Sequence, residues 1–267
     1  MQLRMGVPIT EFWSLAGRYG LSYDDITLDK TIYYFNGVCD PFRAGLYLCD
    51  AVGKRTTSSI GYSLVFDNLD NRMRPTRGRR LLFSQDFAGL GGSVNYLRTN
   101  VDARQYWKPF GSFVFSLSGE GGYIHSFENP RSEGSDKVRL TDRYFLGEPQ
   151  FPGFDIRGIG PRVQRQYYAS DGSLITARNQ VADDALGGRA YYLGRAELEI
   201  PLGAGAREMG LRPSLFAVAG SVFGVANPGT EALPNDTALC RNTISGAIAP
   251  VVPTVDQTLQ QAIVACQ

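Results

Sequence analysis

The chain has 267 residues, 43% of them hydrophobic and 20% charged, a composition typical of an ordered protein. Its 27 Lys and Arg nearly balance its 26 Asp and Glu, so the formal net charge of +1 gives no general attraction to nucleic acid, and we expect no nucleic-acid partner. No run of about 18 apolar residues occurs, which excludes a conventional transmembrane helix but leaves a membrane β-barrel open, because barrel strands need only about 9 to 11 residues.

Eight segments are predicted to be strands because apolar and polar residues alternate along them. Residues 1–8 lack the apolar core and cleavage site of a signal peptide and resemble the end of a strand, so we expect the chain to be part of a longer protein. In the fifth segment, the face that carries Arg98, Asp102 and Arg104 must contact water, which favours a barrel lumen over the core of a soluble β-sandwich. The segments are residues 3–7, 13–23, 60–67, 80–88, 97–104, 113–120, 195–200 and 213–223.

The connections between these segments alternate in length. Short connections are expected at residues 8–11, 68–78, 108–112 and 202–210, and long ones around Cys39, around Arg157 and after Phe223. Outer-membrane barrels show this asymmetry, with short periplasmic turns and long outer loops. Residues 89–92 form the one short connection on the predicted outer side, and residues 254–264 are predicted to form a short helix on the last loop.

The cysteines fall into two local pairs inside predicted loops, Cys39 with Cys49 and Cys240 with Cys266. Local pairs are typical of disulfides formed in an oxidising compartment such as the periplasm. Free or metal-binding thiols are the alternative, but neither spacing matches a zinc site and His125 is the only histidine. We therefore expect no metal.

An enzymatic function finds little support in the sequence. His125 has no adjacent nucleophile motif and is predicted to be a loop residue, and no nucleophile elbow, P-loop or zinc-protease motif occurs. Glu197 and Glu199 share one face of a predicted strand, but such a pair in a lumen is more often solvated or salt-bridged than catalytic. We predict no catalytic residues and no cofactor.

Three motifs carry a resemblance to a known family. Residues 151–161 read FPGFDIRGIGP, in which glycine and proline flank an arginine and favour a fixed position for its guanidinium. This segment resembles the arginine-glycine signature loop of the BamA family of outer-membrane-protein insertases. Residues 62–78, YSLVFDNLDNRMRPTRG, resemble the strand and turn before a Gly-Arg-Arg strand of that family, and residues 6–15, GVPITEFWSL, resemble an earlier hairpin.

The resemblance implies an all-β fold, an antiparallel transmembrane β-barrel of sixteen strands preceded by POTRA domains, located in the bacterial outer membrane. Residues 1–267 would be a partial barrel of about eight strands, roughly the sixth to the thirteenth, without the POTRA domains and the closing strands. Residues 124–188 would form the long signature loop, folded back into the lumen.

The function implied by the resemblance is to help fold and insert β-barrel proteins into the outer membrane, without a cofactor. Its partners would be client outer-membrane proteins, accessory outer-membrane lipoproteins, periplasmic chaperones and the lipid bilayer. Alternatives are an outer-membrane transporter of the two-partner secretion type, a diffusion porin, or a secreted binding module with a β-sandwich fold.

Within the signature motif, Arg157 and Gly158 match the arginine and glycine of the family, and Ile156 takes the preceding aliphatic position. Phe154 belongs to the same segment. Ile159 departs from the aromatic residue that the family commonly has next, so aromatic packing at the tip of the loop is not expected.

The resemblance also implies a partner for the arginine. Glu199 falls where the family has an acidic residue that faces the lumen, with Glu197 on the same face, and a guanidinium can form bidentate, charge-assisted bonds to such a carboxylate. Val218 occupies a second position that is acidic in the family, so we expect the loop to be held less firmly. The alternative is an exposed Arg157 that contacts only water.

Overall fold

The computed structural model describes residues 1–35, 37–39, 44–131, 135–165, 182–202, 211–225, 239–241 and 248–250. Within these ranges, no helix combines the length and the apolar character needed to cross a membrane. The predicted helix at residues 254–264 and Cys266 lie outside the described residues.

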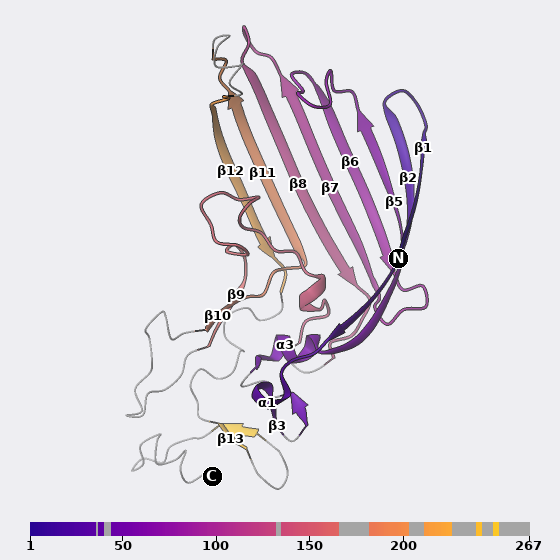
Figure 1. Ribbon diagram of the computed structural model, residues 1–267, viewed down its shortest axis with the longest axis vertical. Helices are drawn as coiled ribbons and strands as arrows, with labels where there is room; N and C mark the ends of the chain where they lie inside the picture. Colours follow the sequence, from indigo (N-terminus) through magenta and orange to yellow (C-terminus); the bar gives the residue numbers. More distant parts are fainter. Residues whose placement is uncertain are drawn as a thin grey trace, which may run out of the picture.

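The main feature is an antiparallel sheet of eight strands in the order β1-β2-β5-β6-β7-β8-β11-β12, so that each strand pairs with the strands of this sheet that precede and follow it in the chain (Figure 1). All eight predicted strands are present, which confirms the partial barrel. Strands β1 and β12 form the two edges of this sheet. The bounds are β1 Gln2–Pro8, β2 Trp13–Ile26, β5 Gly53–Asp67, β6 Gly78–Ala88, β7 Tyr96–Trp107, β8 Val114–Ser126, β11 Ala190–Glu199 and β12 Ser214–Phe223.

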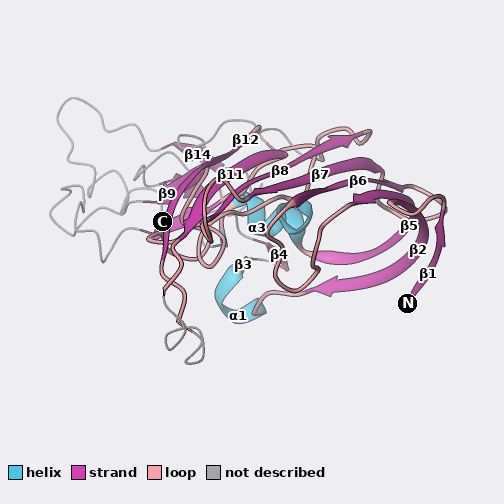
Figure 2. Cartoon of the chain, turned by 90° about the horizontal axis from the view of Figure 1, so that it is seen from above, coloured by secondary structure: helices cyan, strands magenta, loops and turns pink. Residues whose placement is uncertain are grey.

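Short elements lie in the connections between these strands and after β12. Helix α1 begins after Asp29, whose side chain accepts a hydrogen bond from the Thr31 amide, and helix α3 lies on the concave side of the curved sheet (Figure 2). Within the described residues these elements include the helices α1 Lys30–Tyr33 and α3 Leu46–Ala51, the 3-10 helix η1 Leu140–Asp142, and the strand pairs β3 Tyr34–Phe35 with β4 Val38–Cys39, β9 Arg162–Arg165 with β10 Ala182–Ala185, and β13 Leu239–Arg241 with β14 Ile248–Pro250.

The two faces of the sheet differ in polarity, as the alternation predicts. Because side chains alternate along a strand, Arg98, Asp102 and Arg104 of β7 share one face, the one on which Arg98 contacts Asp142 of the long connection, and we call it the luminal face. The convex face carries exposed apolar side chains, including Val101, which is 46% exposed, and Leu117, which is 48% exposed. This arrangement fits a barrel wall with water inside and lipid outside.

The connections at the two ends of the sheet differ in length, again as expected. The turns after β1, β5 and β7 lie at one end, where β11 also ends and which we call the turn end, and long connections follow β2 and β8 at the other end. At that other end, Val138 from the long connection packs on Ala88, Tyr96 and Ile124 of the luminal face. The interior of the sheet is therefore filled there by its own loop.

His125 corrects one prediction, because it lies in β8 rather than in a loop. Strand β8 continues to Ser126 and places His125 on the convex face, where its ring packs edge-on against Phe127 with centroids 4.9 Å apart. Gly119, Gly121 and Gly122 carry no side chains, so the alternation that would have revealed this half of the strand is missing from the sequence.

Candidate functional site

The arginine motif lies in a closed loop, residues 146–159, which we call the motif segment. Its ends meet in an antiparallel bridge, in which the Ile159 amide donates to the Leu146 carbonyl at 3.1 Å. Within it, the Phe151 amide donates to the Gly147 carbonyl at 2.9 Å. A Cβ atom at Gly147 would lie 2.3 Å from the Asp155 carbonyl oxygen, so the close crossing of the chain requires glycine there.

Arg157 has an unusual backbone conformation. Its φ of 59° makes it the one non-glycine residue in the left-handed region among the residues that the structure describes. The next amide, of Gly158, donates to the Asp155 carbonyl at 2.8 Å and closes the turn. Left-handed backbone at a non-glycine residue is strained and clusters at functional sites, which singles out Arg157.

The guanidinium of Arg157 lies over an aromatic ring. Its Cζ atom is 4.7 Å from the centroid of the Phe145 ring, a cation–π contact. Beside it, Ile156 is 76% exposed, and Phe154 packs edge-on against Phe151 with centroids 4.9 Å apart. The tip therefore has aromatic packing, but from Phe145, Phe151 and Phe154 rather than from position 159.

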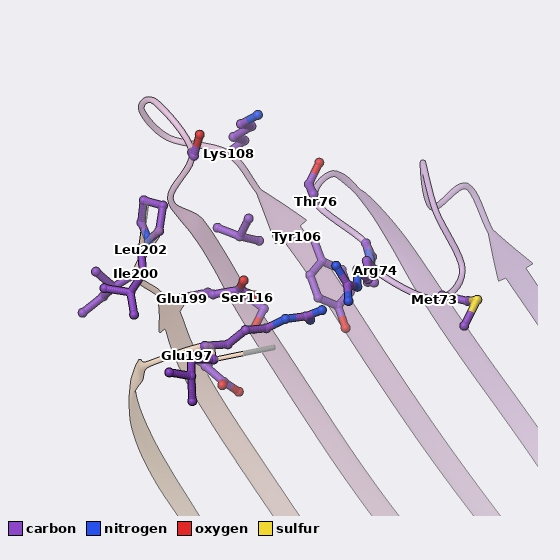
Figure 3. A pocket seen from close by; sticks show the side chains of 16 residues that line it. Met73, Arg74, Thr76, Tyr106, Lys108, Ser116, Glu197, Glu199, Ile200 and Leu202 are labelled. Atoms are coloured by element: carbon purple, nitrogen blue, oxygen red, sulfur yellow. The ribbon is translucent and has the colours of Figure 1, made fainter. Parts of the chain in front are cut away.

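The structure brings the predicted carboxylates into the lumen but not to Arg157. Glu197 pairs with Arg195 on the same strand at 3.0 Å. Glu199 lines a cavity of about 460 Å³ at the turn end, together with Arg74 and Tyr106 (Figure 3). No ion pair joins Arg157 to either glutamate within the described part of the chain, so the pairing with Glu199 stays a prediction.

An apolar cluster attaches the motif segment to the sheet instead. Leu146 is buried together with Leu193 of β11 and Val222 of β12. Ile159 and Val218, the two residues that depart from the pattern of the resembled family, both pack against this cluster. The position where an acid was expected therefore supplies an apolar contact, and these contacts exclude water from the junction.

The long connection between β8 and β11 approaches β12 very closely beside this cluster. A Cβ atom at Gly188 would lie 2.4 Å from the Phe223 carbonyl oxygen, and one at Gly160 would lie 3.0 Å from the Val222 Cβ. Sequence reasoning missed Leu146, Leu193 and Val222. The available signal was an apolar residue, Leu193, on the same strand face as Arg195.

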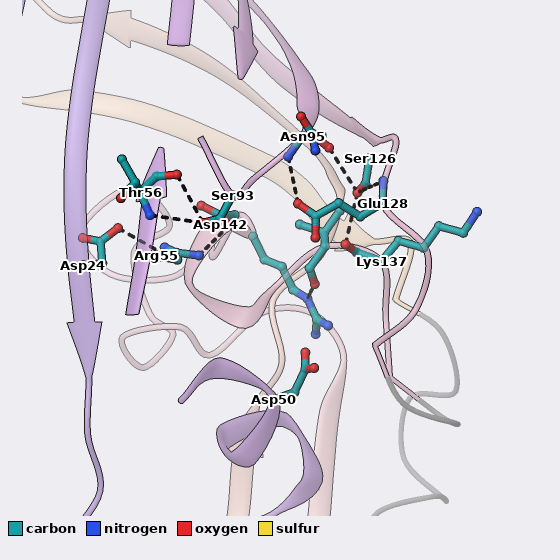
Figure 4. A network of polar contacts seen from close by, with 12 residues as sticks. Asp24, Asp50, Arg55, Thr56, Ser93, Asn95, Ser126, Glu128, Lys137 and Asp142 are labelled. Carbon is teal, nitrogen blue, oxygen red and sulfur yellow. Dashed lines mark hydrogen bonds and ion pairs between the residues drawn. The ribbon is translucent and has the colours of Figure 1, made fainter. Parts of the chain in front are cut away.

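Charged residues hold the other part of the long connection on the luminal face (Figure 4). Arg55 of β5 donates to the carboxylates of Asp142 at 2.8 Å and of Asp24 at 3.2 Å. Arg98 donates to the Asp142 carbonyl at 2.7 Å. The hydroxyl of Tyr144 donates to the Asn100 side chain at 2.5 Å, so η1 and the residues after it are fixed to β2, β5 and β7.

Helix α3 contributes a second group of contacts. Arg131 donates to both carboxylate oxygens of Asp50, at 2.8 and 2.5 Å, and these hydrogen bonds raise the pKa of the Arg131 guanidinium. Arg143 donates to the Val138 and Leu186 carbonyls at 3.0 and 3.1 Å and lies over the Tyr47 ring. Burial lowers the pKa of the Arg143 guanidinium, which carbonyl oxygens and an aromatic face solvate in place of water.

A disulfide joins Cys39 of β4 to Cys49 of α3, as predicted, with the two Cα atoms 5.6 Å apart. It fixes the helix that carries Asp50 and Tyr47. The predicted partner of Cys240, Cys266, lies outside the described residues, so the second pair stays a prediction.

Residues 1–241 match the sequence pattern of the Omp85 superfamily domain. The chain belongs to the Omp85 superfamily. This membership confirms the resemblance to the BamA family and the expected location in the outer membrane.

Individual Omp85 relatives agree with the assignment. Over 176 residues, 66% of this chain and 20% of the relative, the sequence is 33% identical to the outer membrane protein assembly factor BamA of Neorickettsia risticii (strain Illinois). Over 152 residues, 56% of this chain and 27% of the relative, it is 28% identical to the sorting and assembly machinery component 50 homolog of Homo sapiens. The chain thus spans about a quarter of the length of these Omp85 relatives.

The fold is similar to that of a solved Omp85 structure. The crystal structure of BamA from Haemophilus ducreyi lacking POTRA domains 1-3 matches with a TM-score of 0.60 and 20% sequence identity. The match covers 84% of this chain and 41% of that one. At this identity it supports the fold, the partial Omp85 barrel, and no more.

Proposed function

We propose that this chain forms the central wall of an outer-membrane protein assembly factor, which helps fold and insert β-barrel proteins into the bacterial outer membrane. The observation that carries the proposal is the motif segment, which is closed at Leu146 and Ile159 and packed against β11 and β12 on the luminal side of an Omp85 barrel wall. The similarity to relatives named as assembly factors supports it.

The proposed mechanism uses no covalent chemistry, no metal and no cofactor. A client strand in hydrocarbon must pair its backbone groups, because each unpaired group costs several kcal/mol. The neighbouring strands from β1 to β12 are already paired with one another, so this part of the barrel would act as a scaffold rather than as the strand that a client pairs with. Client proteins and the bilayer are the partners of the mechanism, and accessory lipoproteins and periplasmic chaperones are proposed on family resemblance.

The proposal can be tested with the full-length protein reconstituted in liposomes. We expect it to accelerate the folding of an unfolded test barrel protein, measured by the shift in gel mobility between folded and unfolded client. Val222→Asp, which places a carboxylate in the apolar cluster, should reduce this acceleration strongly, because the motif segment would detach. The matched control Ile156→Asp changes an exposed residue of the same segment and should keep most of it.

Two outcomes would overturn the proposal. Ion conductance in planar bilayers without any acceleration of client folding would favour a two-partner secretion transporter or a diffusion porin. In Val222→Asp, increased protease cleavage would show that the motif segment is detached. If client folding were still accelerated equally strongly, the motif segment would have no part in the mechanism.

A further inference from the structure

An apolar groove lies on the convex face at the turn end of the barrel wall. Trp107 of β7, Phe115 of β8 and Leu198 of β11 line it from three neighbouring strands, and Phe110 lines it from the turn after β7. Its volume is about 770 Å³, within the usual size of a site for a small ligand. Trp107 is 42% exposed and Phe110 is 61% exposed, so the groove is open on its outer side.

Aromatic side chains that line the groove pack against other rings. The rings of Trp107 and Phe115 stack with centroids 5.5 Å apart, and those of Phe110 and Phe113 lie 4.7 Å apart. The side-chain amide of Gln105 donates to the Gly78 carbonyl at 3.0 Å and to the Tyr106 carbonyl at 3.2 Å. Because this polar group is satisfied by backbone, it does not disturb an apolar ligand.

The charged residues of the groove are both cations. Arg77 and Lys108 are among its lining residues, Lys108 also borders the cavity of Figure 3, and the lining contains no carboxylate among the described residues. Neither cation has an ion-pair partner within the part of the chain that the structure describes. A nearby cation, Arg79, differs, because its guanidinium lies over the Phe66 ring at 5.1 Å.

We propose that this groove is a binding site for an anionic glycerophospholipid of the bilayer. One acyl chain lies against Trp107, Phe115 and Leu198, and the phosphate lies between Arg77 and Lys108. The groove is continuous with the convex apolar face, which in a barrel wall meets lipid, and Trp side chains favour the level of the headgroups. The site does not depend on the proposed assembly activity.

A phospholipid fits this chemistry better than a protein segment does. The bilayer already covers the convex face, so the occupant needs no further partner, and a phosphate with its attached chain combines one compact anion with one apolar tail. Anionic headgroups gain from each nearby Lys or Arg, which gives the groove a preference for charge that a uniform apolar surface lacks.

The test uses the full-length protein in phosphatidylcholine bilayers that contain a minor fraction of lipid with brominated acyl chains, which quench tryptophan fluorescence on contact. The fluorescence of Trp107 is obtained as the difference in fluorescence between the unaltered protein and the variant Trp107→Phe. We expect brominated phosphatidylglycerol to quench Trp107 at about a fivefold lower fraction than brominated phosphatidylcholine. Trp13 packs on Phe66 outside the groove. Its fluorescence, obtained in the same way from Trp13→Phe, should show a smaller preference for quenching by phosphatidylglycerol.

The cations are tested separately. Removing both in Arg77→Gln/Lys108→Gln should abolish the preference of Trp107 for phosphatidylglycerol. The comparison variant Arg72→Gln/Arg212→Gln removes two cations at the same end that do not line the groove, one beside Asp67 and one at the cavity of Figure 3, and should retain the preference. Equal quenching of Trp107 by the two lipids would show general bilayer contact only, and absence of quenching by either would show that protein covers the groove; each result would overturn the proposal.

Discussion

Gly61 shows how one absent side chain shapes the luminal wall. It lies between Arg18 of β2 and Asp86 of β6 in a row of paired residues across three strands. Above it, the Arg18 guanidinium forms a bidentate pair with the Asp86 carboxylate and also donates to the Ser63 hydroxyl. The ion pair thus passes over the middle strand through the space that a side chain at position 61 would fill.

Substitution of Gly61 by alanine should break this pair. The new Cβ atom would lie 2.1 Å from the Asp86 Oδ1 and 2.7 Å from the Gln85 carbonyl oxygen, so both side chain and backbone must move. We expect a loss of about 1–3 kcal/mol in the free energy of unfolding, measured by urea titration of the full-length protein. Gly17→Ala, where nothing lies within 4 Å of the new atom, is the control, and equal losses in the two variants would refute the explanation.

Asp70 organises the turn between β5 and β6, part of one of the motifs that indicated the family. Its carboxylate accepts hydrogen bonds from the amides of Asn71, Thr76 and Arg77 and from the Thr76 hydroxyl. The hydroxyl contact is the main cause that lowers the pKa of Asp70 from 3.8 to about 2. These contacts explain why the sequence after β5 needs an acid at this position.

The lowered pKa predicts a pH dependence of the turn. A carboxyl group whose pKa is lower in the folded state stabilises that state above its unfolded pKa of 3.8 and loses this effect as the pH falls towards about 2. We expect the amides of Thr76 and Arg77 to lose hydrogen-exchange protection, corrected for intrinsic rates, over this interval. In Asp70→Asn the protection should be lower at neutral pH and nearly independent of pH, and an unchanged profile in that variant would exclude the carboxylate as the cause.

At the scale of elements, two different contacts hold the long connection after β8. Its first part is fixed by arginines such as Arg55 and Arg98, and the motif segment by the apolar cluster of Leu146, Leu193 and Val222. The apolar contact does not weaken with salt as an exposed ion pair would. An ionic contact for Arg157 would therefore add to an attachment that already exists.

Double-mutant cycles can separate the two contacts available to Arg157. We expect Arg157→Ala and Phe145→Leu to show a coupling of about 0.5–1 kcal/mol in the protection of the motif segment, because the guanidinium lies over that ring. The second cycle combines Arg157→Ala with Glu199→Gln. Coupling in the second cycle alone would show that the predicted ion pair, not the ring contact, holds the arginine in the full-length protein.

The strands could be predicted from the sequence because a wall with water on one side and lipid on the other imposes a period of two on each strand. Two elements could not be predicted in this way. The second half of β8 contains glycines, which carry no side chains to alternate, and η1 lies in a segment of mixed polarity without a clear period. The apolar cluster could not be predicted, because Leu146, Leu193 and Val222 come together only through the register of β11 with β12 and the closure of the motif segment. Ile159 and Val218 could be recognised as departures from the family, but not as members of one cluster.

At the scale of the whole molecule, the eight-stranded sheet has edges at β1 and β12. Within hydrocarbon, backbone groups along such edges have no water to bond, and each unpaired group costs several kcal/mol. Paired strands outside this sheet would be needed to satisfy them. The neighbouring strands of a complete Omp85 barrel could do so.

We therefore expect residues 1–267, produced alone and refolded with liposomes, not to persist as a lipid-inserted monomer. Protease digestion of the vesicles, with gel mobility before and after heating, should show a fully degraded or aggregated chain. The full-length protein treated in the same way is the control and should give a protected, heat-modifiable band. A protected monomer of the isolated chain would contradict this expectation.

The attachment of the motif segment to β11 and β12 also has a consequence for the order of folding. The pairs β1–β2, β5–β6 and β7–β8 are hairpins with short connections, whereas β8 and β11 are separated by residues 127–189. Contacts between residues distant in the chain form slowly, because the intervening loop must first be closed. Leu146 can contact Leu193 and Val222 only after this slow step. The motif segment therefore docks only once β11 and β12 have joined the sheet in the correct register.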